Sequence, residues 1–88
     1  MHVEFLRKFS SDIDRIHQKS VKSNLAKMIR SFESAENLNN ISNLKKLVDH
    51  KSAYRIRIGD YRVGFFYENK KAIFARVVHR KDIYEVFP

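Results

Sequence analysis

The chain has 88 residues, 43% of them hydrophobic with seven Phe and four Tyr, which predicts one small folded domain over residues 1–88 and argues against disorder. Cysteine is absent, which excludes disulfides and thiolate metal sites. No apolar run approaches the roughly 20 residues that span a bilayer, so we expect a soluble, cytoplasmic protein. The formal net charge of +8 favours a polyanionic partner, above all nucleic acid, or an acidic protein.

The first part of the chain predicts a strand and a helix. Residues 2–5 alternate in polarity, which is typical of a short strand. From residue 9 onward the apolar residues recur at helical spacing. Ser10 or Ser11 would cap this helix, and Asp12 and Asp14 would lie in its first turn, near the positive end of the helix dipole.

A second helix is predicted from Ser20, its N-cap, to about residue 35. The Asn-rich residues 36–43 predict a loop, and Leu or Ile at every third position up to Leu47 suggests a turn or two of irregular helix lying across the core. The second helix carries one apolar stripe, which we expect to pack on the core: Val21, Leu25, Met28, Ile29 and Phe32.

Residues 54–65 alternate between apolar and mostly charged side chains and predict two strands joined by a Gly-Asp turn. This turn sets a register in which Arg57 faces Arg62 and Arg55 faces Gly64. One face of the hairpin is then apolar and the other is cationic. Like charges directly opposite each other cost roughly 0.2–1 kcal/mol, which favours an anion bound between them. The alternative, that the arginines merely solubilise an exposed face, stays open.

Residues 72–79 predict a third antiparallel strand of ambiguous phase. We place Ile73, Ala75 and Val77 inward, which puts Arg76 on the face of the other arginines. The predicted fold is therefore α+β, with an N-terminal strand, an antiparallel helical hairpin and a three-stranded antiparallel meander forming a small sheet. Apolar residues are expected to anchor the polar tail that follows: Ile83, Val86 or Phe87.

The charge of residues 51–81 is nine Lys or Arg minus two Asp or Glu, or +7. The histidines are scattered and no nucleotide-binding motif is present, so metal-free chemistry on a phosphodiester remains. RNA supplies its own nucleophile, the 2′-hydroxyl, and arginines can neutralise the charge that grows on the phosphorane. Proton transfer needs a group with a lower pKa than Arg, and His79, Lys81 and Tyr84 are the candidates.

Three segments of the chain together resemble the RelE/ParE superfamily of bacterial and archaeal toxins, the toxin halves of type II toxin–antitoxin modules. They are Leu44-Lys45-Lys46-Leu47, Tyr54-Arg55-Ile56-Arg57-Ile58-Gly59-Asp60-Tyr61-Arg62-Val63 and His79-Arg80-Lys81-Asp82-Ile83-Tyr84. The resemblance covers essentially the whole chain and implies a microbial RNase-like fold. For the RelE branch it implies cleavage of messenger RNA in the ribosomal A site, without a metal or cofactor. It also implies neutralisation by a small, acidic, partly disordered antitoxin.

The resemblance implies the residues of the site as well. The ParE branch shares the fold but inhibits DNA gyrase without catalysis, and a plain nucleic-acid-binding module is a third alternative. The arginine cluster and the His/Tyr pair favour the RNase branch. The expected catalytic residues are Arg57, Arg62, His79, Arg80 and Tyr84. The expected RNA contacts are Lys51, Arg55, Arg76 and Lys81.

Overall fold

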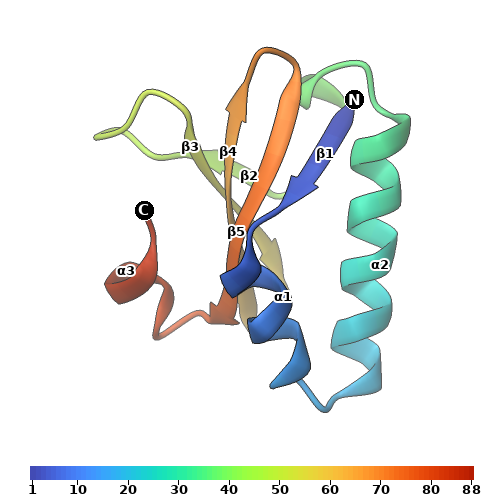
Figure 1. Cartoon of the computed structure of the whole chain (residues 1–88), viewed down its shortest axis with the longest axis vertical. Helices are drawn as coiled ribbons and strands as arrows, with labels where there is room; N and C mark the ends of the chain where they lie inside the picture. The colour runs from blue at the N-terminus through green and yellow to red at the C-terminus, as the bar shows by residue number, and fades with distance from the viewer.

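The computed structural model describes residues 1–88 as one five-stranded sheet with helices on both faces. Figure 1 shows α2 along one face of the sheet and the short α3 on the opposite side. The elements, in chain order, are β1 (His2–Phe5), α1 (Arg7–Asp14), α2 (Lys19–Ser34), a 3-10 turn (Leu38–Asn40), β2 (Leu44–Lys46), β3 (Ala53–Ile58), β4 (Tyr61–Glu68), β5 (Lys71–His79) and α3 (Ile83–Val86).

The sheet has the strand order β1-β5-β4-β3-β2. β1 runs parallel to β5, and the other neighbours are antiparallel. The predicted α+β class and the β3–β4–β5 meander are confirmed, but the sheet is mixed and has five strands because β1 and β2 join its two edges. No helix combines the length and apolar character needed for a membrane crossing.

The predicted register of the β3–β4 hairpin is confirmed. Arg57 pairs with Arg62 and Arg55 pairs with Gly64. Gly59 has a φ of +57°, a conformation that glycine adopts at little cost and that side chains disfavour. The turn therefore sets the register, and the alternation along both strands separates an apolar face from a cationic one.

The main core lies between the sheet and the two long helices. The apolar stripe predicted for α2 is confirmed, since three of its residues are buried in this core and the other two pack against it. Aromatic rings fill the centre, with the Phe32 ring meeting Phe65 and Phe74 edge-on at 5.1 and 5.0 Å. A smaller core lies on the opposite face and holds α3 against the sheet: Ala53, Ala75, Ile83 and Phe87.

The helix starts differ from the predictions. α1 begins at Arg7, so Ser10 and Ser11 lie inside the helix and cap nothing. The helix starts early because the Leu6 N–H still donates to a carbonyl of β5, and the chain turns directly from β1 into α1. α2 begins at Lys19, one residue before the predicted cap.

Two further predictions were wrong in part. The irregular helix predicted up to Leu47 is a 3-10 turn followed by the strand β2, which pairs with β3. The inward phase predicted for β5 holds for Val77 but fails for Ile73 and Ala75, because the pairing with β4 shifts by one residue between Gly64 and Phe65. As a result Phe74 and Val77 both face the main core, whereas Ala75 lies in the smaller core on the other face.

Candidate functional site

Basic side chains from three neighbouring strands line an open pocket of about 340 Å³ on the α3 side of the sheet. β2 places Lys45 next to Arg55 of β3, and the hairpin places Arg57 next to Arg62. Residues directly opposite each other on paired strands project from the same face, so the register alone gathers these charges. The pocket is lined by Asn43, Lys45, Arg55, Arg57, Arg62 and Tyr84.

Neutral oxygens, and no carboxylate, orient the arginines. The Arg62 Nη1 donates to the carbonyls of Gly59 (2.9 Å) and Tyr61 (3.0 Å). The Arg57 backbone N–H donates to the Asn43 carbonyl at 3.2 Å, and its Nη2 lies 3.5 Å from Oδ1 of the same Asn43. The three ion pairs of the protein lie elsewhere. The positive charge of the pocket is therefore available to an anionic ligand.

Tyr84 completes the pocket from α3. Its side chain is 74% exposed, and the Arg55 guanidinium carbon lies 4.5 Å from the centroid of its ring. The pKa of Tyr84 lies below its ordinary value of 10.0, mainly through the hydrogen bond that Arg55 offers the phenolate. The positive charges of Arg55, Lys45 and Arg62 lower the pKa further. The lowered pKa makes Tyr84 suited to accept a proton next to a bound phosphate.

Two buried side chains hold α3 in place. Ile83 is fully buried and Phe87 is 6% exposed, as the sequence predicted for the anchor of the tail. The Phe87 ring packs directly over Gly64, where a Cβ atom would come within 3.0 Å of three ring carbons. Glycine in the middle of β4 is therefore required by the close approach of α3, which in turn sets the position of Tyr84.

The structure brings four of the nine predicted site residues into the pocket: Arg55, Arg57, Arg62 and Tyr84. Arg80 does not line the pocket; its backbone N–H donates to the Asp60 carbonyl (2.8 Å) in the same hairpin turn that Arg62 contacts. Lys51 and Lys81 are exposed and line no part of the pocket.

His79 lies on the opposite face of the sheet from the basic pocket. It pairs with Tyr61, and the two rings meet at 5.9 Å between centroids. Tyr61 packs against the main core, and a small pocket places His79 beside Ile16 and Val77 of that core. Its Nδ1 accepts a hydrogen bond from the Lys81 N–H at 3.3 Å.

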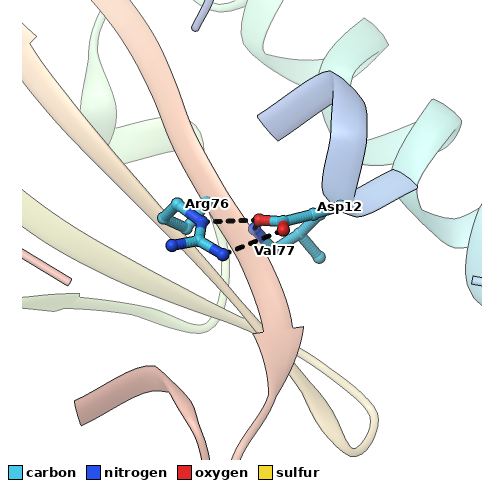
Figure 2. Close-up of polar contacts among 3 residues, drawn as sticks. All are labelled: Asp12, Arg76 and Val77. Carbon is cyan, nitrogen blue, oxygen red and sulfur yellow. Dashed lines mark hydrogen bonds and ion pairs between the residues drawn. The ribbon is translucent and has the colours of Figure 1, made fainter. Parts of the chain in front are cut away.

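Arg76 does not contribute to the basic pocket either. Its guanidinium forms two hydrogen bonds to the Asp12 carboxylate, from Nε at 2.7 Å and from Nη2 at 2.9 Å (Figure 2). The Asp12 side chain is 4% exposed and that of Arg76 is 17% exposed. This pairing raises the pKa of Arg76 and neutralises its charge. The register confirms that Arg76 projects from the face of the other arginines, since it lies opposite Gly64, which in turn lies opposite Arg55. It is not an available cation, however, because its guanidinium is bonded to the Asp12 carboxylate of α1 at the edge of β5.

Two lining residues were missed by the sequence reasoning, Asn43 and Lys45. Lys45 belongs to the Leu-Lys-Lys-Leu segment, which has no period-two alternation, so the sequence carried no local signal for a strand there. Asn43 has a φ of +63° and lies at the turn into β2. Asn is enriched in this conformation, which was the available signal for a turn there.

Comparison with known proteins identifies the class to which this fold and basic pocket belong. The family model of the ParE toxin of the type II toxin–antitoxin system parDE matches residues 3–84. The chain therefore belongs to the RelE/ParE family and is a toxin of the type II toxin–antitoxin class.

Individual relatives support this assignment over the full length of the chain. Toxin RelE3 of Methanocaldococcus jannaschii is 33% identical over 89 residues, covering 100% of both chains. The toxin in the crystal structure of a RelB-RelE antitoxin-toxin complex from Methanococcus jannaschii superposes with a TM-score of 0.83 at 30% identity, over 97% of this chain and 99% of that one. The fold also matches a YoeB dimer from Staphylococcus aureus, with a TM-score of 0.74 at 15% identity, over 91% and 97%.

Proposed function

We propose that this toxin is a metal-independent endoribonuclease that cleaves messenger RNA in the ribosomal A site and so inhibits translation. The observation that carries the proposal is the basic pocket, in which one lysine and three arginines converge without a carboxylate around a tyrosine of lowered pKa. Such a pocket repels metal cations and attracts a phosphodiester. The similarity to RelE toxins supports the same reaction class.

The arginines act on the charge of the phosphate. Attack on phosphorus places additional negative charge on the non-bridging oxygens, and Arg57 and Arg62 project together from the sheet to meet it. Because neutral oxygens hold both guanidinium groups in place before the RNA arrives, little reorganisation is needed when the charge develops.

Protons move at the edge formed by α3 and β2. The 2′-hydroxyl oxygen attacks phosphorus and gives its proton to the Tyr84 phenolate, and the bond from phosphorus to the 5′-oxygen breaks. Lys45, the only amine that lines the pocket, supplies the proton that the departing 5′-oxygen takes up. The products are a 2′,3′-cyclic phosphate and a 5′-hydroxyl end.

An acidic antitoxin is the proposed partner. RelB-RelE complexes from Methanococcus jannaschii and Pyrococcus horikoshii show related toxins with their antitoxins. A protein of net charge +8 attracts an acidic chain over long distances, and that chain would cover the same cations that the RNA needs.

The decisive experiment maps messenger RNA ends by primer extension shortly after the toxin is induced in a bacterium. Cuts within translated regions are expected for the natural chain and not for Arg62→Ala. The matched control is Arg30→Ala, an exposed arginine of α2 on the opposite face, which should leave the cuts in place. Intact transcripts in arrested cells would contradict the proposal.

The second candidate function is ParE-like, non-enzymatic inhibition of DNA gyrase, which the name of the matching family model favours. The two functions separate cleanly in the same cells. A DNA-damage response with intact transcripts supports the gyrase target, whereas transcript cleavage without that response supports the ribonuclease.

A further inference from the structure

A second cavity of about 360 Å³ opens beside the basic pocket, between the β2–β3 loop and the C-terminal segment. The two cavities share Lys45, Arg55 and Tyr84, so they form one continuous depression. Figure 1 shows the β2–β3 loop and α3 on the same side of the sheet. In contrast to the basic pocket, this groove is lined by several apolar side chains: Leu47, Val48, Phe87 and Pro88.

The loop that forms the groove is held in one conformation by its own polar groups. The Lys46 ammonium donates to the carbonyls of His50 (3.2 Å) and Lys51 (3.0 Å) across the loop. The His50 ring lies 5.5 Å from the Phe66 ring, centroid to centroid. A wall that is ordered before the ligand binds loses less conformational entropy on binding.

His50 lines the groove, and its Nε2 atom makes no hydrogen bond within the protein. Its Nδ1 accepts a hydrogen bond from the Ser52 backbone N–H at 3.3 Å. A neutral imidazole that accepts at Nδ1 carries its proton on Nε2. The ring therefore offers an N–H donor beside an apolar surface, where Val48 is 94% exposed.

We propose that this groove binds the nucleobase of the nucleotide next to the scissile phosphate, with Val48 packing on the base and His50 reading an acceptor on its edge. The inference rests on the proposed ribonuclease function and deepens it, because it makes the β2–β3 loop the segment that selects the cut site. An apolar and aromatic surface continuous with a phosphate-binding pocket is the arrangement by which proteins bind single-stranded nucleic acid.

Charge and continuity favour RNA as the occupant of the groove. Its rim carries Lys45, Lys46 and Arg55 against one acidic residue, Asp49, so an anionic ligand is attracted to both cavities at once. A chain whose phosphate occupies the basic pocket has its next base within the same depression, with Tyr84 between the two.

The test is a map of cut positions across the transcripts of cells that express each variant. For the natural chain we expect a base preference at one nucleotide flanking the cut. His50→Ala should reduce that preference on the order of tenfold, the scale of one lost base contact, while cutting continues. The matched control is His17→Ala, an exposed histidine of the α1–α2 turn, which should leave the preference unchanged.

Val48→Asp provides a second variant at a position too exposed to affect folding. The added carboxylate should repel the RNA and lower cutting on the order of tenfold, whereas Leu6→Asp, at an exposed apolar side chain of the β1–α1 junction, should not. Cuts of unchanged number and base preference in both groove variants would overturn the inference and leave the ribonuclease function standing. Loss of antitoxin binding by Val48→Asp with an unchanged cut map would assign the groove to the antitoxin and would also overturn the inference.

Failure of the ribonuclease proposal itself is recognised separately, because the natural chain would then make no cuts. In that case nuclear magnetic resonance with an RNA trinucleotide lacking the attacking 2′-hydroxyl decides the inference. Shifts at the Val48 methyls that disappear with an abasic trinucleotide support a base in the groove. Shifts confined to the arginines, or no shifts, overturn it.

Discussion

Asp12 and Arg76, which are 64 positions apart in the sequence, form a two-pronged ion pair that closes the edge of β5. The same carboxylate also accepts the Val77 backbone N–H at 3.0 Å. β1 covers β5 only as far as Phe74, so this N–H would otherwise have no partner at the open edge. The Asp12 carboxylate therefore neutralises the charge of Arg76 and also accepts the backbone N–H at the open edge of β5.

Removal of this carboxylate should destabilise the fold. Asp12→Ala leaves the Arg76 charge and the Val77 N–H without partners, and we expect a loss on the order of 3 kcal/mol in the free energy of unfolding. Urea denaturation of the purified chain measures it. Asp14→Ala is the matched control, because that residue is exposed in the same helix and should change stability far less. Equal losses in the two variants would contradict the role assigned to the ion pair.

The pairing of Arg57 with Arg62 should lower the stability of the fold and raise the cleavage rate. Their guanidinium groups extend from directly opposed positions, so Arg57→Ala relieves a repulsion and should raise the free energy of unfolding by roughly 0.2–1 kcal/mol. The same change should lower RNA cleavage about 10²-fold to 10³-fold, as expected when one donor to a developing oxyanion is lost. Melting curves and cleavage rates on one preparation test both effects. A variant that is less stable and fully active would reverse the assignment.

The pH dependence of cleavage should follow Tyr84. If its phenolate accepts the proton, the rate rises with pH through the lowered pKa of Tyr84, which lies below the ordinary value of 10.0. Tyr84→Phe keeps the ring over Arg55 but removes the oxygen, so cleavage should fall about 10²-fold to 10⁴-fold and lose this rise. A pH–rate profile measured on ribosomes programmed with a short messenger RNA distinguishes the two proteins. A profile of unchanged shape in the variant would show that Tyr84 only stacks.

His79→Ala should leave cleavage within a few-fold of the natural chain, because the His79 ring packs against Tyr61 on the face away from the arginines. The measurement is the same cleavage rate, compared with that of Tyr84→Phe. A folded His79→Ala variant as inactive as Tyr84→Phe would return His79 to the catalytic role that the sequence suggested.

Gly64→Ala should disable the site without altering any residue in it. The added methyl group collides with the Phe87 ring, so α3 must move and carry Tyr84 away from Arg55. We expect cleavage to fall about as far as in Tyr84→Phe, while the main core stays folded. The chemical shifts of the assigned Tyr84 ring and the cleavage rate report the two events. Full activity with an unmoved Tyr84 would contradict the packing.

The hairpin could be predicted from the sequence because strict alternation and a two-residue turn leave only one register. The β5 phase could not, because the bulge at Ala75 lets Phe74 and Val77 face the same core, and nothing in the local pattern marks the extra residue. β2 was missed for a related reason. It has three residues, and the spacing of Leu44 and Leu47 is equally typical of a helix.

The composition of the site was predicted better than its geometry. Residue types identified the arginines and the tyrosine. The predicted inward phase of Val77 already placed His79, two residues further on, on the core face and away from the arginines. The loss of Arg76 to an ion pair depends on Asp12, whose place on α1 was predicted for the wrong end of the helix. The loss of Arg76 therefore comes from a contact between distant parts of the chain, which no local pattern shows.

The packing of Phe87 on Gly64 has a consequence for how such a gene decays. A toxin gene that escapes its antitoxin places every cell that carries it under selection for loss of function. Substitutions at the contact between α3 and the sheet should recur among survivors as often as those of the arginines, since Ile83, Phe87 and Gly64 all position Tyr84. Sequenced survivors should therefore yield inactive, antitoxin-binding proteins whose cationic face is intact.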